Sequence, residues 1–277
     1  MRRAFEAGVC FKRRYVGVMD EAERLRHASS FGEVAVAYAR HRPDYCRDAV
    51  RWALAMAPGH RVLDLGAGTG KLTEALVRAG LDTVAVEPDP AMLAELHRTV
   101  PGVHAVPGSA EAIPLPDASV DGVVAGNAMH WFDMVLAGPE IARILVPGGI
   151  LSGLWNVLDD RVGWVADLAR VSGPEAIGPR DTPDRWRAET ASAHLPANGE
   201  AARFGSPEQA QFRHGQRRTA DTLVHTLATR AGMLVMPEQE RQERLNQIRA
   251  FLALCPETAD DEFDLPMLTC VLRTRRL

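Results

Sequence analysis

The residues with the clearest chemical signature form a glycine-rich turn at positions 64–70. Its sequence, Asp-Leu-Gly-Ala-Gly-Thr-Gly, follows the apolar pair Val62–Leu63 and precedes a segment of helical pattern that starts at Lys71. Glycine adopts positive φ angles without strain and lets a ligand touch the backbone. A turn of this kind between a strand and a helix lies at the carboxyl edge of a parallel sheet, where doubly wound proteins bind nucleotides. The turn therefore predicts a nucleotide-like ligand.

Three classes of ligand compete for this turn. A phosphate-binding P-loop requires a Gly and a Ser or Thr at the positions of Leu65 and Leu72. A dinucleotide fingerprint requires Gly at the position of Lys71, and the carboxylate of Asp64 would repel a pyrophosphate. A nucleoside without phosphates but with a charged amino-acid tail suits Asp64, because a carboxylate attracts an ammonium group. The pattern favours this third class over the other two.

Two further residues are placed to act on such a ligand. Glu87 ends the second predicted strand; the alternative for it is an acid at the start of the next helix, although Asp89 can fill that position. His130 follows the fourth predicted strand, so we expect it above the carboxyl edge of the sheet. An imidazole there could take a proton from a hydroxyl, an amine or a carbon acid. The alternative for His130 is a ring that packs beside Trp131 and only shapes the pocket. Asp133 is expected to cap the following helix.

The elements that position these residues alternate between strand and helix from about residue 29 to residue 156. We expect strands at 61–65, 83–86, 103–106, 119–125 and 150–155, and helices at 44–56, 71–79, 90–99 and 133–145. Buried strands that alternate with helices predict a parallel sheet. Further on, strands are expected at 211–217 and 265–275, and helices at 219–231 and 237–254. The prediction is an α/β, Rossmann-like, doubly wound sheet of seven strands, mostly parallel, with an antiparallel C-terminal edge strand and helices on both faces.

The domain organisation follows from the same patterns. Residues 1–28 are expected to form a flexible N-terminal extension, and residues 29–277 a single domain. Five prolines and few large aliphatic residues lie between 172 and 208. We therefore expect irregular chain there, within a lid or insertion at 157–208.

Composition excludes several classes of function. The chain has 277 residues, 25% of them charged, and a net charge of -4, which argues against a general nucleic-acid binder. The absence of an 18-residue apolar run argues against a membrane span. Nine His without an HExxH motif or a Cys/His cluster predict no metal site. The widely spaced cysteines suit a reducing cytoplasm; they are Cys10, Cys46, Cys255 and Cys270.

The glycine turn resembles the first motif of the class I S-adenosylmethionine-dependent methyltransferases, and the likeness extends over about half of the chain. Residues 108–117 resemble the family's adenine loop, and residues 121–131 its fourth strand with the loop that follows. Residues 143–149 resemble the turn into its fifth strand. Residues 31–45 look like the helical cover of the ubiquinone/menaquinone-type small-molecule branch.

The resemblance implies a methyltransferase that uses S-adenosyl-L-methionine, releases S-adenosyl-L-homocysteine and acts on an O, N or C atom of a small molecule. Glu87 is then expected to hold both ribose hydroxyls. Ser109 stands where many members carry Asp, so its contact with adenine would be weaker or bridged by water. The resemblance assigns His130 to catalysis and these residues to the cofactor: Tyr38, Arg42, Asp64, Gly66, Ala67, Gly68, Gly70, Glu87, Pro88, Met92, Ser109, Ala110, Glu111 and Asn127.

Two other functions stay open. The same fold could serve a cyclase or lyase that uses the cofactor without methyl transfer, or a protein that binds adenosylmethionine without turnover. We expect a monomer or homodimer whose partner is a small-molecule acceptor, with no nucleic acid and no membrane.

Overall fold

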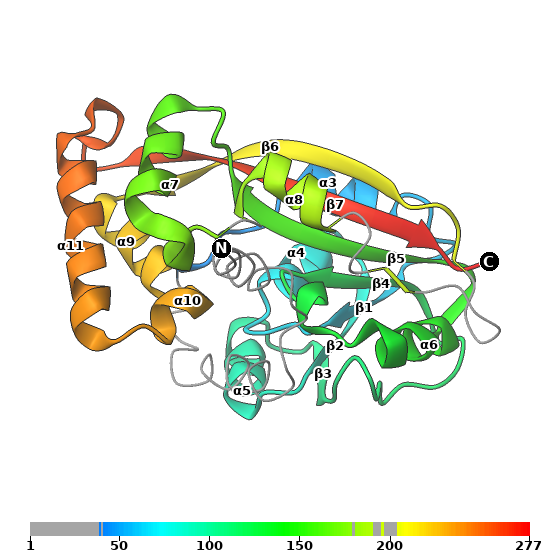
Figure 1. The fold of residues 1–277 in the computed structure, drawn as a ribbon. Helices are drawn as coiled ribbons and strands as arrows, with labels where there is room; N and C mark the ends of the chain where they lie inside the picture. The colour runs from blue at the N-terminus through cyan, green and yellow to red at the C-terminus, as the bar shows by residue number, and fades with distance from the viewer. Residues whose placement is uncertain (1–38, 40, 179–180, 191–194, 197–203) are drawn as a thin grey trace, which may run out of the picture.

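The computed structural model describes residues 39, 41–178, 181–190, 195–196 and 204–277. A twisted seven-stranded sheet carries helices on both faces, and a group of helices lies at one end of it (Figure 1). The expected extension at 1–28 and the candidate residue Tyr38 lie outside the described residues.

The sheet has the strand order β3-β2-β1-β4-β5-β7-β6, and its first five strands are parallel. These strands are β1 (Arg61–Leu65), β2 (Asp82–Glu87), β3 (His104–Pro107), β4 (Val120–Gly126) and β5 (Leu145–Leu158). β7 (Phe263–Arg275) runs antiparallel to β5, and β6 (Glu208–Arg218) runs antiparallel to β7. This is the doubly wound mixed sheet that the sequence predicts.

The antiparallel C-terminal strand is present, but it lies one place inside the edge of the sheet. β6 pairs with β7 along its whole length and takes the edge position itself. The physical reason is burial. Most residues of β7 are buried, whereas β6 is largely polar and has no fully buried residue. A polar strand suits an edge because charged side chains there oppose pairing with another chain.

Helices cover both faces of the sheet. α3 (Arg47–Leu54), α4 (Lys71–Arg78) and α5 (Pro90–Thr99) pack on one face. α6 (Met134–Ile144) and α8 (Pro183–Thr190) lie on the other face, over the largest core cluster. Asp133 caps α6 as expected, since its side chain accepts a hydrogen bond from the Val135 amide.

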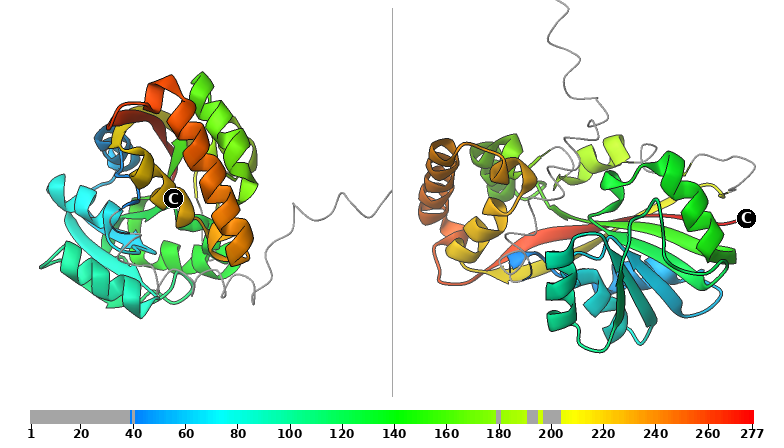
Figure 2. Two further views of the ribbon diagram at one scale, coloured as in Figure 1. Left: turned by 90° about the vertical axis from the view of Figure 1, so that its left-hand side faces the viewer. Right: turned by 90° about the horizontal axis from the view of Figure 1, so that it is seen from below.

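Four more helices form a second unit beyond the carboxyl end of β5 (Figures 1 and 2). They are α7 (Gly163–Ala176), α9 (Ala220–Ala228), α10 (Ala231–Leu234) and α11 (Glu238–Leu254). Their apolar faces share a core with the ends of β5 and β7, including Leu168, Leu227 and Ile248. This helical unit faces the edge of the sheet where the glycine turn lies.

The prediction of irregular chain between 172 and 208 is wrong where helices α7 and α8 occupy it. The first five residues of that range, Ser172 among them, belong to α7, which contains a break at Gly173, and α8 follows from Pro183. Prolines made the segment look irregular. Pro183, however, stands at the first position of α8, where a missing N–H costs nothing, and Pro174 follows the break. No helix among the described residues is long and apolar enough to cross a bilayer.

Candidate active site

A cavity of about 720 Å³ opens between the carboxyl edge of the sheet and the helical unit. This volume falls in the range of pockets that bind small molecules and cofactors. Its near wall contains the turn after β1, the end of β2, the loop at 108–111 and the residues that follow β4. Its far wall comes from the end of α7, from Asp181 and from the start of α10.

Two positions in the glycine turn favour glycine for different physical reasons. Gly66 and Gly68 both have positive φ, 69° and 56°. A Cβ at Gly66 would lie 2.8 Å from the Cβ of Ala128, so packing excludes a side chain there. A Cβ at Gly68 would meet nothing within 4 Å, and Gly68 lines the cavity. The turn thus leaves open space at Gly68 for a ligand to approach the backbone.

Glu87 is buried at the end of β2, and both of its carboxylate oxygens are fixed. Oε2 accepts a hydrogen bond from the Gly68 amide at 2.8 Å, and Oε1 accepts one from the Asp89 amide at 2.9 Å. Burial raises the pKa of Glu87 above its ordinary value. The Asp89 side chain accepts from the amides of Ala91 and Met92. Asp89, not Glu87, therefore caps α5. Each oxygen of Glu87 keeps a lone pair for a ligand hydroxyl.

Asp64 lies fully buried beneath the turn. Its Oδ2 accepts a hydrogen bond from Thr73 Oγ1 at 2.7 Å, whereas Oδ1 has no hydrogen-bond partner among the described residues. Burial raises the pKa of Asp64 to about 7; the Thr73 hydrogen bond opposes the shift, and the charge of Glu87 adds to it. A buried carboxylate oxygen without a partner is unfavourable, and a cationic group at this site would stabilise it.

The loop at 108–111 lines the cavity with Ser109, Ala110 and Glu111. The Glu111 carboxylate also has a structural contact, because it accepts a hydrogen bond from the Asp133 amide at 2.9 Å. Just after this loop in the chain, the Ile113 amide donates a hydrogen bond to the carboxylate of Glu140 in α6 at 3.0 Å. The loop is therefore positioned by α6.

Arg143 completes this attachment, and its role was missed by sequence reasoning. Its guanidinium donates to the carbonyls of Ile113 at 2.9 Å and Leu115 at 2.8 Å, and it pairs with Glu140 and Asp117. These pairs raise the pKa of Arg143 further above its ordinary value. The sequence signal for this role was the spacing of Glu140 and Arg143 by about one helical turn. That spacing did not reveal the role, because it is equally typical of a surface ion pair.

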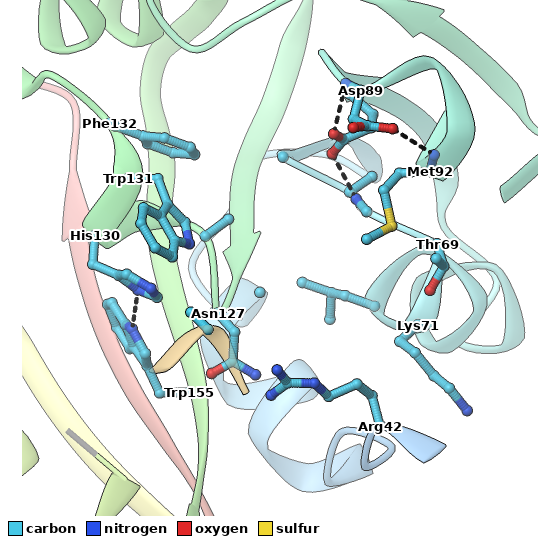
Figure 3. Close-up of a pocket in the computed structure, with 18 of the residues that line it drawn as sticks. Arg42, Thr69, Lys71, Asp89, Met92, Asn127, His130, Trp131, Phe132 and Trp155 are labelled. Atoms are coloured by element: carbon cyan, nitrogen blue, oxygen red, sulfur yellow. Dashed lines mark hydrogen bonds between the residues drawn. The ribbon is translucent and has the colours of Figure 1, made fainter. Parts of the chain in front are cut away.

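Aromatic side chains from three segments line another part of the cavity (Figure 3). His130 and Trp131 belong to the short helix η2 (Met129–Trp131), Phe132 follows it, and Trp155 comes from β5. The rings of His130 and Trp131 are 4.8 Å apart. Trp155 Nε1 donates to His130 Nδ1 at 3.4 Å. An indole N–H can only donate, so this contact favours the neutral tautomer of His130 with its proton on Nε2.

The segment before α3 lines a further side of the cavity with Arg42, Pro43 and Tyr45. Arg42 lines it and donates to the Thr229 carbonyl at 3.1 Å, at the end of α9. Asn127 has a positive φ of 50°, and its side-chain Nδ2 donates to the Tyr45 hydroxyl at 3.2 Å. Figure 3 shows Arg42 reaching toward Asn127. The segment from Arg42 to Tyr45 is thus held in place by Thr229 and Asn127, which are distant from it in the chain.

The structure brings most of the predicted site residues to this one cavity. Besides those above, Ala67, Pro88 and Met92 line it, whereas Gly70 is the N-cap residue of α4 and does not line it. Other aromatic and histidine side chains lie elsewhere: Trp186 packs behind Trp155, Trp164 against Phe263, His214 against Thr269 and His225 against His41. The described residues contain no cluster of His, Cys, Asp and Glu that could hold a metal.

Comparison with known proteins shows which family has this sequence and fold. Residues 63–153 match the family described as "Methyltransferase domain". Over 245 residues the chain is 40% identical to Rv3342 of Mycobacterium tuberculosis, described as an uncharacterized methyltransferase, covering 88% of this chain and 94% of that protein. A solved structure from Anaeromyxobacter dehalogenans, assigned to the type II methyltransferases, covers 85% of this chain at 26% identity with a TM-score of 0.60.

A third similarity covers a shorter stretch. A demethylmenaquinone methyltransferase of Beutenbergia cavernae is 38% identical over 106 residues, which is 38% of this chain and 44% of that protein. Together with the sheet order and the glycine turn, these findings define the class. The chain belongs to the class I S-adenosylmethionine-dependent methyltransferases, and it is an enzyme that transfers methyl groups.

Proposed function

We propose that this protein transfers the methyl group of S-adenosylmethionine to a small-molecule acceptor bound between the sheet edge and the helical unit. The observation that carries the proposal is the pair of buried carboxylates, Asp64 and Glu87, at the base of the cavity. One has an oxygen without a partner, and the other keeps lone pairs beside an open glycine backbone. Phosphates would be repelled there, whereas an ammonium group and a ribose suit the two sites.

The residues of the near wall fit the parts of this cofactor. Glu87 would accept hydrogen bonds from the two ribose hydroxyls, and Asp64 would attract the amino group. Met92 and Ala110 are both largely buried apolar side chains at the cavity wall and would flank adenine. Arg42 carries the positive charge suited to the cofactor's carboxylate. Tyr38, Ser109 and Asn127 remain proposed contacts.

When bound, the cofactor supplies an electrophilic methyl group, so the protein has to align the acceptor and exclude water. The aromatic side chains of Trp131, Phe132 and Trp155 provide an apolar surface for that purpose. We propose that His130 donates a hydrogen bond to the acceptor from Nε2, because the Trp155 contact disfavours the tautomer in which Nε2 is a base.

The finer assignment rests on partial likeness. The similarity to a demethylmenaquinone methyltransferase supports membership in the ubiquinone/menaquinone-type branch, although only over 106 residues. We propose residues 29–277 as a single domain in which the lining residues of the segment 157–208, namely Pro174, Glu175, Gly178 and Asp181, cover the acceptor. A cyclase or lyase remains the alternative, and product mass separates the two because only transfer adds a methyl group to the acceptor.

Calorimetric titration with four ligands tests the proposal. S-adenosylmethionine and S-adenosylhomocysteine are expected to bind with micromolar or tighter dissociation constants, and NAD and ATP are expected not to bind. Binding of NAD alone would overturn both the cofactor assignment and the roles given to Asp64 and Glu87.

The pH dependence of binding follows from Asp64. In the free protein its pKa is about 7, and a bound ammonium group would lower it. Protonated Asp64 must therefore lose its proton on binding, so the affinity for S-adenosylhomocysteine is expected to rise with pH from 5.5 to about 7, by up to about tenfold per unit. Above that pH the affinity should level off. The raised pKa of Glu87 acts in the same direction.

Two variants serve as controls in titrations at pH 5.5 to 7.5. Asp64→Asn should bind more weakly and with a much flatter pH profile. Thr73→Val removes the hydrogen bond that lowers the pKa of Asp64, so the rise should extend to higher pH. A parent profile already flat across this range would show that Asp64 does not contact the cofactor's amino group.

A further inference from the structure

In the wall of the cavity opposite the glycine turn, Gly232 of α10 packs against the backbone of Glu175 in α7. α7 breaks at Gly173, where φ is +71°, and Pro174 and Glu175 then line the cavity. A Cβ at Gly232 of α10 would lie 2.6 Å from the Glu175 carbonyl oxygen. Because Gly232 has no side chain, α10 packs directly on the bend. This packing places Arg230, the residue before α10, in the wall.

Arg230 is held in place by an ion pair. Its Nη1 donates to Asp181 Oδ1 at 2.6 Å, and the two side chains are only 13% and 21% exposed. Asp181 Oδ2 accepts a second hydrogen bond from the Gly178 amide at 2.7 Å. Both oxygens of Asp181 therefore have protein partners. The pair fixes the guanidinium without using all of its donors.

The guanidinium has hydrogen-bonding capacity left over. Its Nε has no hydrogen-bond partner among the described residues. The contact with Asp181 uses Nη1, so the edge formed by Nε and Nη2 is the one that remains. That edge of an arginine binds a carboxylate through two parallel hydrogen bonds. Nε itself is buried, so its N–H reaches the cavity only if the guanidinium turns about its ion pair with Asp181.

Two further arginines and one carboxylate lie around this point. Arg42 donates to the carbonyl of Thr229, the residue before Arg230. Its charge is assigned above to the cofactor's carboxylate, so Arg230 is the arginine that we assign to the acceptor. The carboxylate of Glu175 lies near Gly173, on the side where the Arg244 guanidinium also reaches: a Cβ at Gly173 would be 2.9 Å from Glu175 Oε2 and 3.0 Å from Arg244 Nη1. Arg244 donates to the Val171 carbonyl at 3.1 Å, and Glu175 Oε2 is buried without a hydrogen-bond partner among the described residues.

We propose that Arg230 binds a carboxylate of the methyl acceptor and that the acceptor is an aromatic carboxylic acid. The half-buried rings of His130, Trp131 and Phe132 line the same cavity and suit a flat apolar body (Figure 3). Arg230 supplies the polar contact that orients this body. The proposal rests on the proposed function, because the cofactor has to occupy the side of the glycine turn.

Calorimetry on the full chain, saturated with S-adenosylhomocysteine, tests this subsite. The probes are benzoate, 4-hydroxybenzoate and indole-3-acetate, each compared with its uncharged amide. At least one acid is expected to bind about tenfold or more tightly than its amide, as a charged two-point contact requires. Arg230→Gln should abolish that preference and leave the affinity for S-adenosylhomocysteine within about twofold. Arg230→Lys keeps the charge without the two-point geometry and should retain part of the preference.

Arg170→Gln is the matched control, because Arg170 also pairs with an aspartate, Asp167, but on the exposed face of α7. It should leave the preference unchanged. Equal binding of acids and amides, no binding of any acid, or a preference that survives Arg230→Gln would each overturn the subsite. Failure of the parent protein to bind S-adenosylhomocysteine would instead overturn the proposed function. If Arg230→Gln lowers the melting temperature, the Arg230→Lys variant is the test: a partly retained preference for the acid supports the subsite, and an unchanged preference overturns the two-point contact.

Discussion

Replacing Glu87 with alanine is expected to weaken the binding of S-adenosylhomocysteine about ten- to a hundredfold. Hydrogen bonds to a charged group contribute about 1.5–3 kcal/mol, and each 1.4 kcal/mol corresponds to a tenfold change in the dissociation constant. Glu87 also fixes the amide of Gly68, so the alanine variant loses both the acceptor for ribose and the anchor of the turn. Isothermal titration of parent and variant measures the effect.

Glu87→Gln separates these two contributions. Glutamine retains the shape of the side chain and one acceptor oxygen, which can still hold the Gly68 amide, while its NH2 group then faces the Asp89 amide. It should therefore bind more weakly than the parent but more tightly than the alanine variant. Glu74→Ala is the control, because Glu74 pairs with Arg78 on the surface of α4 and does not line the cavity. Unchanged dissociation constants in both Glu87 variants would mean that Glu87 only holds the turn.

Replacing His130 with alanine is expected to lower the turnover number by about 10² or more, with little change in cofactor affinity. Loss of a positioned hydrogen-bond donor or of an acid–base group has effects of this size. His130 lines the cavity beside Trp131 and accepts a hydrogen bond from Trp155. Methyl transfer to the acceptor at saturating cofactor, together with the melting temperature of each variant, measures the effect.

His130→Gln tests which role the ring has. Glutamine offers an N–H donor but no basic nitrogen, so it should retain most of the turnover if His130 donates, as the contact with Trp155 favours. Equal losses in the alanine and glutamine variants would assign His130 the role of a base and contradict the tautomer inferred from Trp155. Full activity in both would leave His130 as a packing residue.

The near wall of the site could be predicted because its signals are local. Asp64, the glycines and the start of α4 are contiguous, and positive φ at Gly66 and Gly68 leaves glycine as the residue of choice. Glu87 was predictable for a related reason: the carboxyl ends of parallel strands meet at one edge, so the end of β2 must lie beside the turn after β1.

What the sequence by itself determined is therefore the strand–turn–helix unit, the parallel sheet and the acidic base of the cavity. Only the tertiary structure decided the far wall, where Arg230 meets Asp181 and where Gly232 lets α10 pack on α7. It also decided that Arg143 holds the loop beside the cavity and that β6 takes the edge of the sheet. The physical reason is that these contacts join residues far apart in the chain, and neither periodicity nor local turn chemistry carries information about such pairs.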